Sequence, residues 1–187
     1  MFKRLIALIL TTGLLLAASP ATAALNAYMT VKGQKSGQIK GSVTQKGRED
    51  SIMVIAYEHQ LTAPVDVKSG QATGKRQHGV FKFTKELDRS SPQLINAWVT
   101  GEVLQEVVIR FYSPQVKAGL GAGGEYNQYT VKLTNARIVG IRSYMLNNKN
   151  PELTRYESAE ELTLVYDTIE WTWNDGGITA TDTWAGR

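Results

Sequence analysis

The sequence has no cysteine, only two histidines and little net charge. A chain without cysteine can form no disulfide, no thiol nucleophile and no thiolate metal site. The histidines, His59 and His78, would need carboxylates as further zinc ligands, and no spacing in the sequence indicates them. We expect His59 to pack in an apolar strand and His78 to lie in a cationic loop. The sequence therefore predicts no metal and no cofactor.

Basic residues hardly outnumber acidic ones. The full chain has 21 lysines and arginines against 17 aspartates and glutamates, a formal charge of +4. Lys3 and Arg4 belong to a first segment that we expect to be removed, which leaves 19 against 17 and a charge of +2. Nucleic-acid-binding domains are usually far more basic. We therefore expect no nucleic-acid partner.

The one long apolar run lies at the start of the sequence. Two basic residues precede apolar residues 5–18, and Ala21-Thr22-Ala23 fits the small-residue cleavage pattern of secretory signals. The run is short for the about 20 apolar residues that cross a bilayer. We expect residues 1–23 to be a cleavable signal peptide, with a retained anchor as the alternative. Residues 24–187 are then expected to form a single domain.

Patterns that often mark enzymes have a plainer interpretation here. Residues 119–124, GLGAGG, match G-x-G-x-x-G, but strand-like sequence follows instead of the helix that would bind a pyrophosphate. Ser90 and Ser91 are placed to cap a helix, and the sequence contains no G-x-S-x-G motif. Glu160 and Glu161 lie in strand-like sequence, which is a poor setting for paired catalytic carboxylates. We predict a protein that is not an enzyme.

Short stretches of alternating apolar and polar residues dominate the chain. Turn-forming clusters separate them, which is typical of a β-barrel or β-sandwich. One helix is indicated, because Ser91 can cap it, Pro92 fits its first turn and Gly101 can end it. The expected strands are residues 27–31, 38–43, 52–60, 80–84, 103–112, 126–133, 137–146, 162–173 and 178–181. The alternative for 126–133 and 137–146 is one long strand broken by a bulge at Asn135-Ala136. The strand expected at 162–173 needs a bulge near Asp167-Thr168, where the alternation of apolar and polar residues changes phase.

The strand expected at 52–60 is apolar on both faces over most of its length, which favours a central position in the sheet. Alternation puts Met53, Ile55 and Tyr57 on one face and Ile52, Val54 and Ala56 on the other. Glu58 and Gln60 then make the second face polar.

Two separated motifs resemble one protein family. Residues 73–92 read TGKRQHGVFKFTKELDRSSP, and residues 164–173 read LVYDTIEWTW, with Trp184 after them. The linking segment at 129–138, YTVKLTNARI, also fits. This pattern resembles the Hcp (haemolysin-coregulated protein) family, the tube subunits of bacterial type VI secretion systems, over residues 28–184. The resemblance implies an Hcp-like β-barrel of two packed antiparallel sheets with one short α-helix.

The resemblance also implies a structural function. Hcp subunits form hexameric rings that stack into a tube and carry or chaperone effector proteins, so a homo-hexamer, effectors and other secretion-system components are the expected partners. The residues implied in subunit contact or ring stacking are Gln45, Lys46, Arg48, Glu49, Lys75 and Arg76. Glu58 and Gln60 are implied to face the lumen of the tube, and a strand end that emerges into solvent is the alternative.

The predicted signal peptide departs from this family pattern. Hcp subunits ordinarily lack one, because they assemble in the cytoplasm and leave through the secretion machine itself. A functional signal favours a periplasmic or secreted protein, and with it the alternative of an Hcp-like binding module that is not built into a tube. A translation start near Met29 would instead leave cytoplasmic assembly in place.

Overall fold

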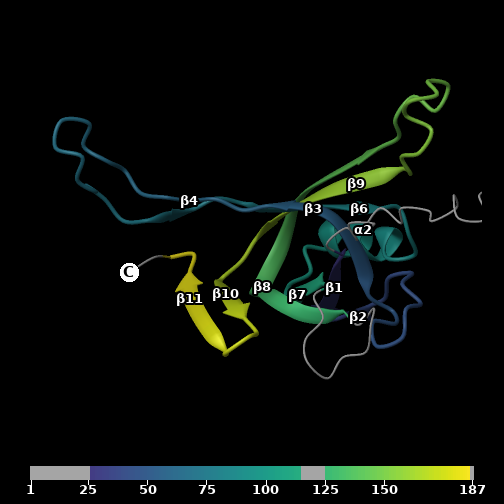
Figure 1. Ribbon diagram of the computed structural model, residues 1–187, viewed down its shortest axis with the longest axis horizontal. Coiled ribbons are helices and arrows are strands. Elements are labelled where there is room, and N and C mark those ends of the chain that lie inside the picture. Colours follow the sequence, from purple (N-terminus) through teal and green to yellow (C-terminus); the bar gives the residue numbers. More distant parts are fainter. Residues whose placement is uncertain (1–25, 115–124, 186–187) are drawn as a thin grey trace, which may run out of the picture.

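The computed structural model describes residues 26–114 and 125–185, which form a mainly β fold (Figure 1). The predicted signal peptide and the glycine-rich segment at 119–124 lie outside the described residues. The strands are β1 (Asn26–Gly33), β2 (Gly37–Ile39), β3 (Ile52–Glu58), β4 (Leu61–Thr62), β5 (Gln77–His78), β6 (Phe81–Glu86), β7 (Leu104–Ser113), β8 (Tyr126–Tyr144), β9 (Ala159–Val165), β10 (Thr168–Trp173) and β11 (Ile178–Thr183). Helix α2 spans Ser91–Val99. Within the described residues, no helix has the length and apolar character needed to span a membrane.

Six of these strands close into a barrel. Hydrogen bonds join them in the order β8-β7-β1-β3-β6-β9, and β9 pairs again with β8. β10 also pairs with β8 and has β11 on its other side, while the short β2 pairs with β1. The prediction of a β-barrel with one short helix is confirmed. Its two sheets are parts of one continuous antiparallel sheet.

The core of the barrel consists of the apolar residues that alternate along its strands. Met29, Ile109 and Leu133 are fully buried there. Leu94 and Ala97 bury one side of α2 in the same cluster, and the helix packs against β8. Full burial of an aliphatic side chain of this size contributes about 1.5–3 kcal/mol, so a common core stabilises helix and barrel together.

β8 changes partners halfway along its length. Its first half pairs with β10, up to Thr134 opposite Thr168, and its second half pairs with β9, from Arg137 opposite Val165. Asn135 marks the change with a positive φ of 52°, a conformation that asparagine tolerates better than most residues. β9 and β10 are therefore one long strand interrupted at residues 166–167, close to the break predicted from the phase of alternation.

The alternation predicted for β3 is wrong beyond Val54. The pairing of β3 with β6 shifts register between Val54 and Ala56, so the strand contains a bulge at Ile55. An extra residue in one strand reverses which face the following residues occupy. Tyr57 therefore lies on the same inner face as its partner Phe83, and its ring stacks on the buried Phe81 with ring centroids 5.8 Å apart, although 45% of Tyr57 stays exposed. Ala56 and Glu58 lie on the outer face instead.

The start of α2 also differs from its predicted cap. The helix begins at Ser91, and the preceding Ser90 makes no side-chain capping hydrogen bond. The Ser91 hydroxyl instead accepts from the backbone N–H of Asp88 at 3.1 Å and from Lys85 Nζ at 3.0 Å. The helix ends as predicted, since Gly101 follows it with a φ of 62°.

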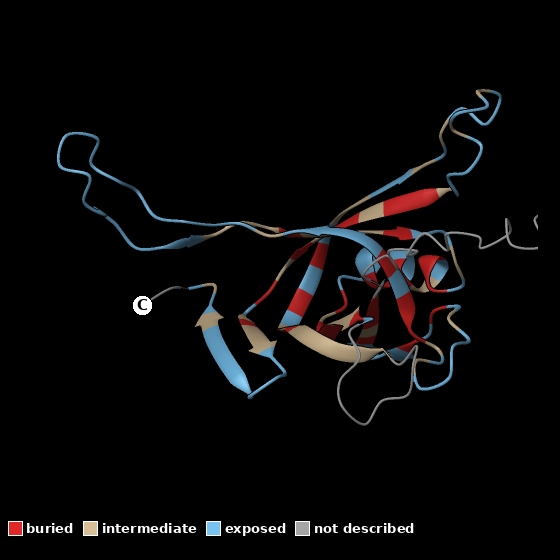
Figure 2. Ribbon diagram, viewed as in Figure 1, coloured by how far each residue is buried: buried red, intermediate tan, exposed pale blue. Residues whose placement is uncertain are grey.

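A long two-stranded arm, residues 59–80, extends from β3 and β6 away from the barrel (Figure 1). β4 and β5 pair within it, and Val65 bridges Ala72 nearer the tip. At the tip, the Asp66 carboxylate accepts from the backbone N–H groups of Lys68 and Ser69 at 3.0 and 2.7 Å. Figure 2 shows the arm as mostly exposed. The apolar core of the barrel therefore contributes little to the stability of most of the arm.

Candidate functional site

The arm meets the barrel at a cluster that we call the arm root, formed by His59, Arg76, His78, Tyr166 and Asp182. The Tyr166 hydroxyl lies between the two imidazoles, 2.6 Å from His59 Nε2 and 2.7 Å from His78 Nδ1. The other nitrogen of His78, Nε2, lies 3.2 Å from Asp182 Oδ2. Asp182 also accepts two hydrogen bonds from the Arg76 guanidinium. The outgoing and returning strands of the arm are thus both tied to the barrel.

Aromatic rings surround this polar cluster. The Trp184 ring meets Tyr166 edge to face at 5.2 Å between centroids and lies 6.0 Å from the His78 ring. His59 lies 5.6 Å from the Phe81 ring and 6.0 Å from Trp171. Hydrogen bonds in such surroundings are less exposed to competition from water. The rings hold the polar groups in one arrangement.

The charges at the arm root follow from these contacts. Hydrogen bonds from the Arg76 guanidinium lower the pKa of Asp182 to about 2, so its carboxylate is ionised at neutral pH. Burial raises the pKa of the Tyr166 hydroxyl, which therefore stays protonated. Burial, and secondly the charge of His78, lower the pKa of His59. The cluster favours neutral His59 at neutral pH.

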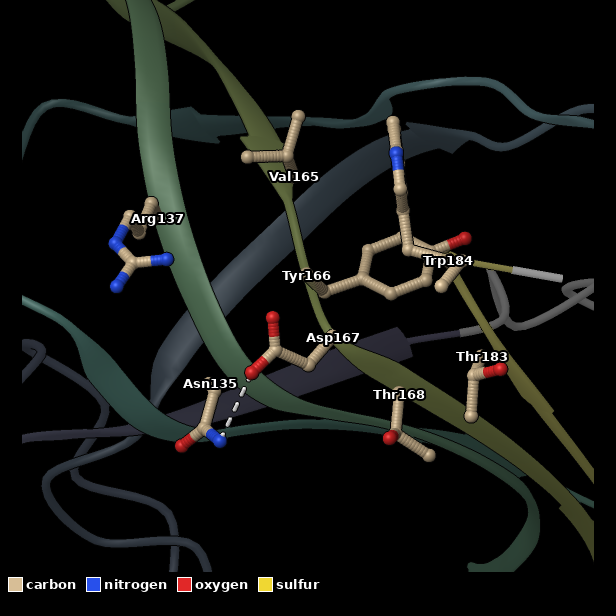
Figure 3. Close-up of a pocket in the computed structure, with 9 residues that line it drawn as sticks. Asn135, Arg137, Val165, Tyr166, Asp167, Thr168, Thr183 and Trp184 are labelled. Carbon is tan, nitrogen blue, oxygen red and sulfur yellow. Dashed lines mark hydrogen bonds between the residues drawn. The ribbon is translucent and has the colours of Figure 1, made fainter.

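A pocket of about 620 Å³ opens beside the arm root. Figure 3 shows Tyr166 and Trp184 side by side in its wall, with Asp167 hydrogen-bonded to Asn135. That bond joins Asn135 Nδ2 to Asp167 Oδ2 at 3.1 Å. The lining also includes the exposed Arg137 and the aliphatic Val165. The pocket thus combines aromatic, aliphatic and charged groups.

The polar loop predicted to contact another subunit is held firmly within its own chain. Arg48 lies over the Tyr112 ring at 3.5 Å to the centroid and over the Tyr28 ring at 4.7 Å. Its Nη1 lies 2.7 Å from Glu125 Oε2, and its side chain is 8% exposed. Gln45 Oε1 accepts from both the Tyr28 hydroxyl and Arg48. These contacts fix the loop, and a contact of Gln45 or Arg48 with another copy stays a prediction.

The remaining predicted contact residues differ in whether their charged groups bind other groups of the same chain. Lys46, Glu49 and Lys75 are exposed. Glu49 accepts from the backbone N–H of Gly47 at 2.8 Å and so shapes its own loop. Arg76 is bound to Asp182 at the arm root. Lys46 and Lys75 are the predicted contact residues whose ammonium groups form no ion pair among the described residues.

The predicted lumen residues lie on an exposed surface. Glu58 is exposed at the end of β3, opposite Lys82 of β6, and Gln60 is exposed at the start of the arm. Glu58 shares a shallow hollow with Lys82 and Glu161. The bulge at Ile55 explains why this surface is polar, because it turns Glu58 outward and Tyr57 inward.

Four members of the arm root, His59, His78, Tyr166 and Asp182, were not predicted as site residues from the sequence. His59 and Tyr166 are 107 positions apart, and Asp182 follows Arg76 by 106. No local spacing indicates contacts of that separation. The sequence contained only an indirect indication of Tyr166. The break in alternation close to residues 166–167 indicates that a residue there does not take part in regular strand pairing.

Comparison with known proteins gave consistent matches. A family model described as "Type VI secretion system effector, Hcp" matches residues 28–173. The "Major exported protein" of Pseudomonas aeruginosa is 35% identical over 167 residues, which cover 84% of this chain and 94% of that protein. A variant of Hcp1 from E. coli EAEC 042 superposes with a TM-score of 0.74 at 36% identity, covering 86% of this chain and 99% of the other. The secreted protein Hcp3 of P. aeruginosa gives a TM-score of 0.65 at 29% identity, with 86% and 99% covered.

Proposed function

Because this chain belongs to the Hcp family of type VI secretion system proteins, we propose that it is a structural subunit of the secretion tube. In this proposal, six copies form a ring, rings stack into a tube, and the tube carries or chaperones effector proteins. The function requires no active site and no cofactor. It requires surfaces on one copy that are complementary to different surfaces on the next, because a ring is built from head-to-tail contacts.

The observation that carries this proposal is the exposed arm. A two-stranded ribbon on its own is marginally stable in water, yet this arm extends far from the barrel (Figure 2). Its apolar side chains are left uncovered, with Leu61 43%, Val65 55% and Val67 97% exposed. A second copy of the chain would bury these side chains and supply the stability that the arm lacks alone.

Exposed apolar side chains on the barrel support the same proposal. Met53 and Ile55 of β3 are exposed, as are Trp98 and Val99 of α2. Apolar surface that stays uncovered in a monomer often marks a protein–protein contact. These side chains are candidates for the surfaces that neighbouring copies share.

The mass of the assembly tests the proposal. Size-exclusion chromatography with light scattering should give about six times the mass of one chain. The variant Val67→Lys should reduce the assembled fraction, because it places a charge where burial is expected. Thr179→Lys on the exposed β11 is the matched control and should assemble normally. A wild-type protein that remains a monomer at all concentrations would contradict the ring.

A monomer would favour a second candidate function, a periplasmic or secreted binding module on the same barrel. The pocket of about 620 Å³ beside the arm root favours this reading, since pockets of this size accept small ligands. The predicted signal peptide favours it too. Mass spectrometry of the protein from periplasm, cytoplasm and medium separates the cases. A terminus at Ala24 indicates a cleaved signal, whereas a terminus near Met29 indicates the cytoplasmic route.

A further inference from the structure

The arm root has a geometry that restricts where its protons lie. The Asp182 carboxylate is ionised and can only accept, so His78 Nε2 must carry the proton that faces it at 3.2 Å. In a neutral His78, Nδ1 is then bare and accepts from the Tyr166 hydroxyl at 2.7 Å. The Tyr166 oxygen, having donated its proton, accepts from His59 Nε2–H at 2.6 Å. With both imidazoles neutral, the Tyr166 hydroxyl and the two ring nitrogens that face it are all hydrogen-bonded. His78 Nε2–H faces the Asp182 carboxylate at ion-pair distance without a well-aligned hydrogen bond.

One added proton leaves the contacts intact. A proton on His78 Nδ1 makes that nitrogen a donor toward the Tyr166 oxygen. The hydroxyl then turns to donate to His59 Nε2, and the proton of the neutral His59 ring moves to Nδ1. All three side chains remain hydrogen-bonded, and the Asp182 carboxylate faces the new charge. The three side chains form a hydrogen-bond relay, and the first added proton reverses the donor and acceptor roles along it.

A second proton cannot be accommodated in the same way. With both imidazoles cationic, His59 Nε2 and His78 Nδ1 both donate to the Tyr166 oxygen, and the hydroxyl proton loses its acceptor within the relay. Two positive rings then lie 6.2 Å apart between centroids. The charged groups around them are Asp182 from β11 and Arg76 from the arm, and the carboxylate is already shared with Arg76. The other close contacts are aromatic rings.

We propose that the arm root is an acid-sensitive latch, in which the His59–Tyr166–His78–Asp182 relay holds the base of the arm on the barrel until both imidazoles are protonated. His59 precedes β4 and His78 ends β5, so loss of the relay frees both strands of the arm at once. The latch belongs to a single chain. It therefore does not depend on the proposed ring.

The direction of the pH effect follows from His59. Its pKa in the docked arm lies below the ordinary 6.5, chiefly because of burial. The undocked state therefore binds a proton more readily than the docked state. Docking is fully stabilised above pH 6.5, and this stabilisation is lost as pH falls from there through the depressed pKa of the docked state.

Spin-label distances within one chain test the latch. The chain has no cysteine, so Ser69→Cys at the arm tip and Thr179→Cys on β11 give a clean labelled pair. Labelled chains are diluted into unlabelled protein, so that only distances within a chain are read. The distance distribution should be narrow at pH about 7.5 and broad at pH about 5. An unchanged distribution at the two pH values would overturn the proposal.

Two variants separate the relay from a general effect of acid. Tyr166→Phe keeps the ring and removes the hydroxyl, so its distribution should be broad at both pH values. Tyr156→Phe, at an exposed tyrosine, is the matched control and should behave as wild type. His59→Gln keeps a neutral donor toward Tyr166 and cannot take the second proton, so its arm should stay docked at the lower pH. If His59→Gln releases the arm as readily as wild type, the second proton is not the cause.

Nitrogen NMR gives a readout that is independent of arm motion. His59 and His78 are the only histidines, so their ring signals can be assigned by the two single substitutions. At pH about 8, both rings should be protonated at Nε2 and bare at Nδ1. As pH falls, His59 should change from the Nε2–H to the Nδ1–H form before it becomes cationic. A His78 ring bare at Nε2 at high pH would contradict the relay.

Discussion

Lys85 shows how the family motif at the helix start stabilises this fold. Its side chain is fully buried, and Nζ lies 2.8 Å from Glu160 Oε1 and 2.9 Å from Asp88 Oδ1. The ammonium also donates to the backbone carbonyl of Glu86 at 2.7 Å. Lys85→Met leaves the buried Glu160 carboxylate without its counter-ion, which should cost about 3–5 kcal/mol of unfolding free energy. Urea unfolding measures this loss.

The double variant Lys85→Met with Glu160→Leu is the control for that prediction. Removing both charges leaves no unpaired buried ion, so the double variant should recover much of the loss. If the double variant is as unstable as the sum of the two single variants, the pair does not act as a unit and the prediction fails.

Glu102 should give the protein a stability that depends on acid pH. Its buried carboxylate accepts from the backbone N–H groups of Ser36 and Lys35 at 2.7 and 2.6 Å. The hydrogen bond from Ser36 is the largest cause of a pKa below the usual 4.5. The carboxylate therefore stabilises the fold above pH 4.5, and this contribution is lost as pH falls through its depressed folded-state pKa. Unfolding curves for Glu102→Gln should show a smaller change with pH over this range, and an unchanged slope would contradict the assignment.

At the scale of the element, the polar loop at residues 41–51 is the clearest case of a surface segment held by its own chain. Arg48 should be its main anchor, because it stacks on two tyrosines and pairs with Glu125. Arg48→Ala should cost about 1–2 kcal/mol and increase amide hydrogen exchange in the loop. Lys46→Ala, at an exposed neighbour, should change neither. Equal exchange in the two variants would remove Arg48 from this role.

Most elements could be predicted from sequence because alternation and turn residues are local signals. β7 and α2 begin and end close to their expected bounds. β3 shows where such reasoning fails, since a bulge at Ile55 reverses the faces and no residue there requires one. The sequence predicts a cap from the Ser91 hydroxyl, but the buried Lys85 ammonium and the Asp88 N–H donate to it instead. Tertiary partners decided both cases.

The candidate site was less predictable than the fold. Arg76 and His78 were found in a cationic loop, but their partners Asp182 and Tyr166 come from the other end of the chain. The free-energy gain of that contact depends on closure of the whole barrel, which brings β11 and the β9–β10 break beside the arm. The sequence does not show that Arg76 is paired inside its own chain. A contact of Arg76 with another copy stays a prediction.

At the scale of the whole molecule, the barrel and the arm differ in how they are stabilised. The barrel has a continuous apolar core. The arm depends on its root and on whatever covers its exposed valines and leucine. An assembly that covers the arm would therefore stabilise the arm and leave the stability of the barrel unchanged. Partial loss of the contacts at the arm root should reduce assembly while the barrel remains folded.

Lys75 and Arg76 allow these two requirements to be separated. Both are cationic neighbours on the arm, but Lys75 is exposed and forms no ion pair among the described residues, whereas Arg76 binds Asp182. Lys75→Glu should weaken assembly only if this part of the arm contacts another copy, and it should leave the arm docked. Arg76→Glu should undock the arm, because it faces the Asp182 carboxylate with a second negative charge. Light scattering reports assembly and the spin-label distance reports docking. A docked arm in Arg76→Glu would contradict the role of the ion pair, and normal rings in Lys75→Glu would exclude Lys75 from the contact.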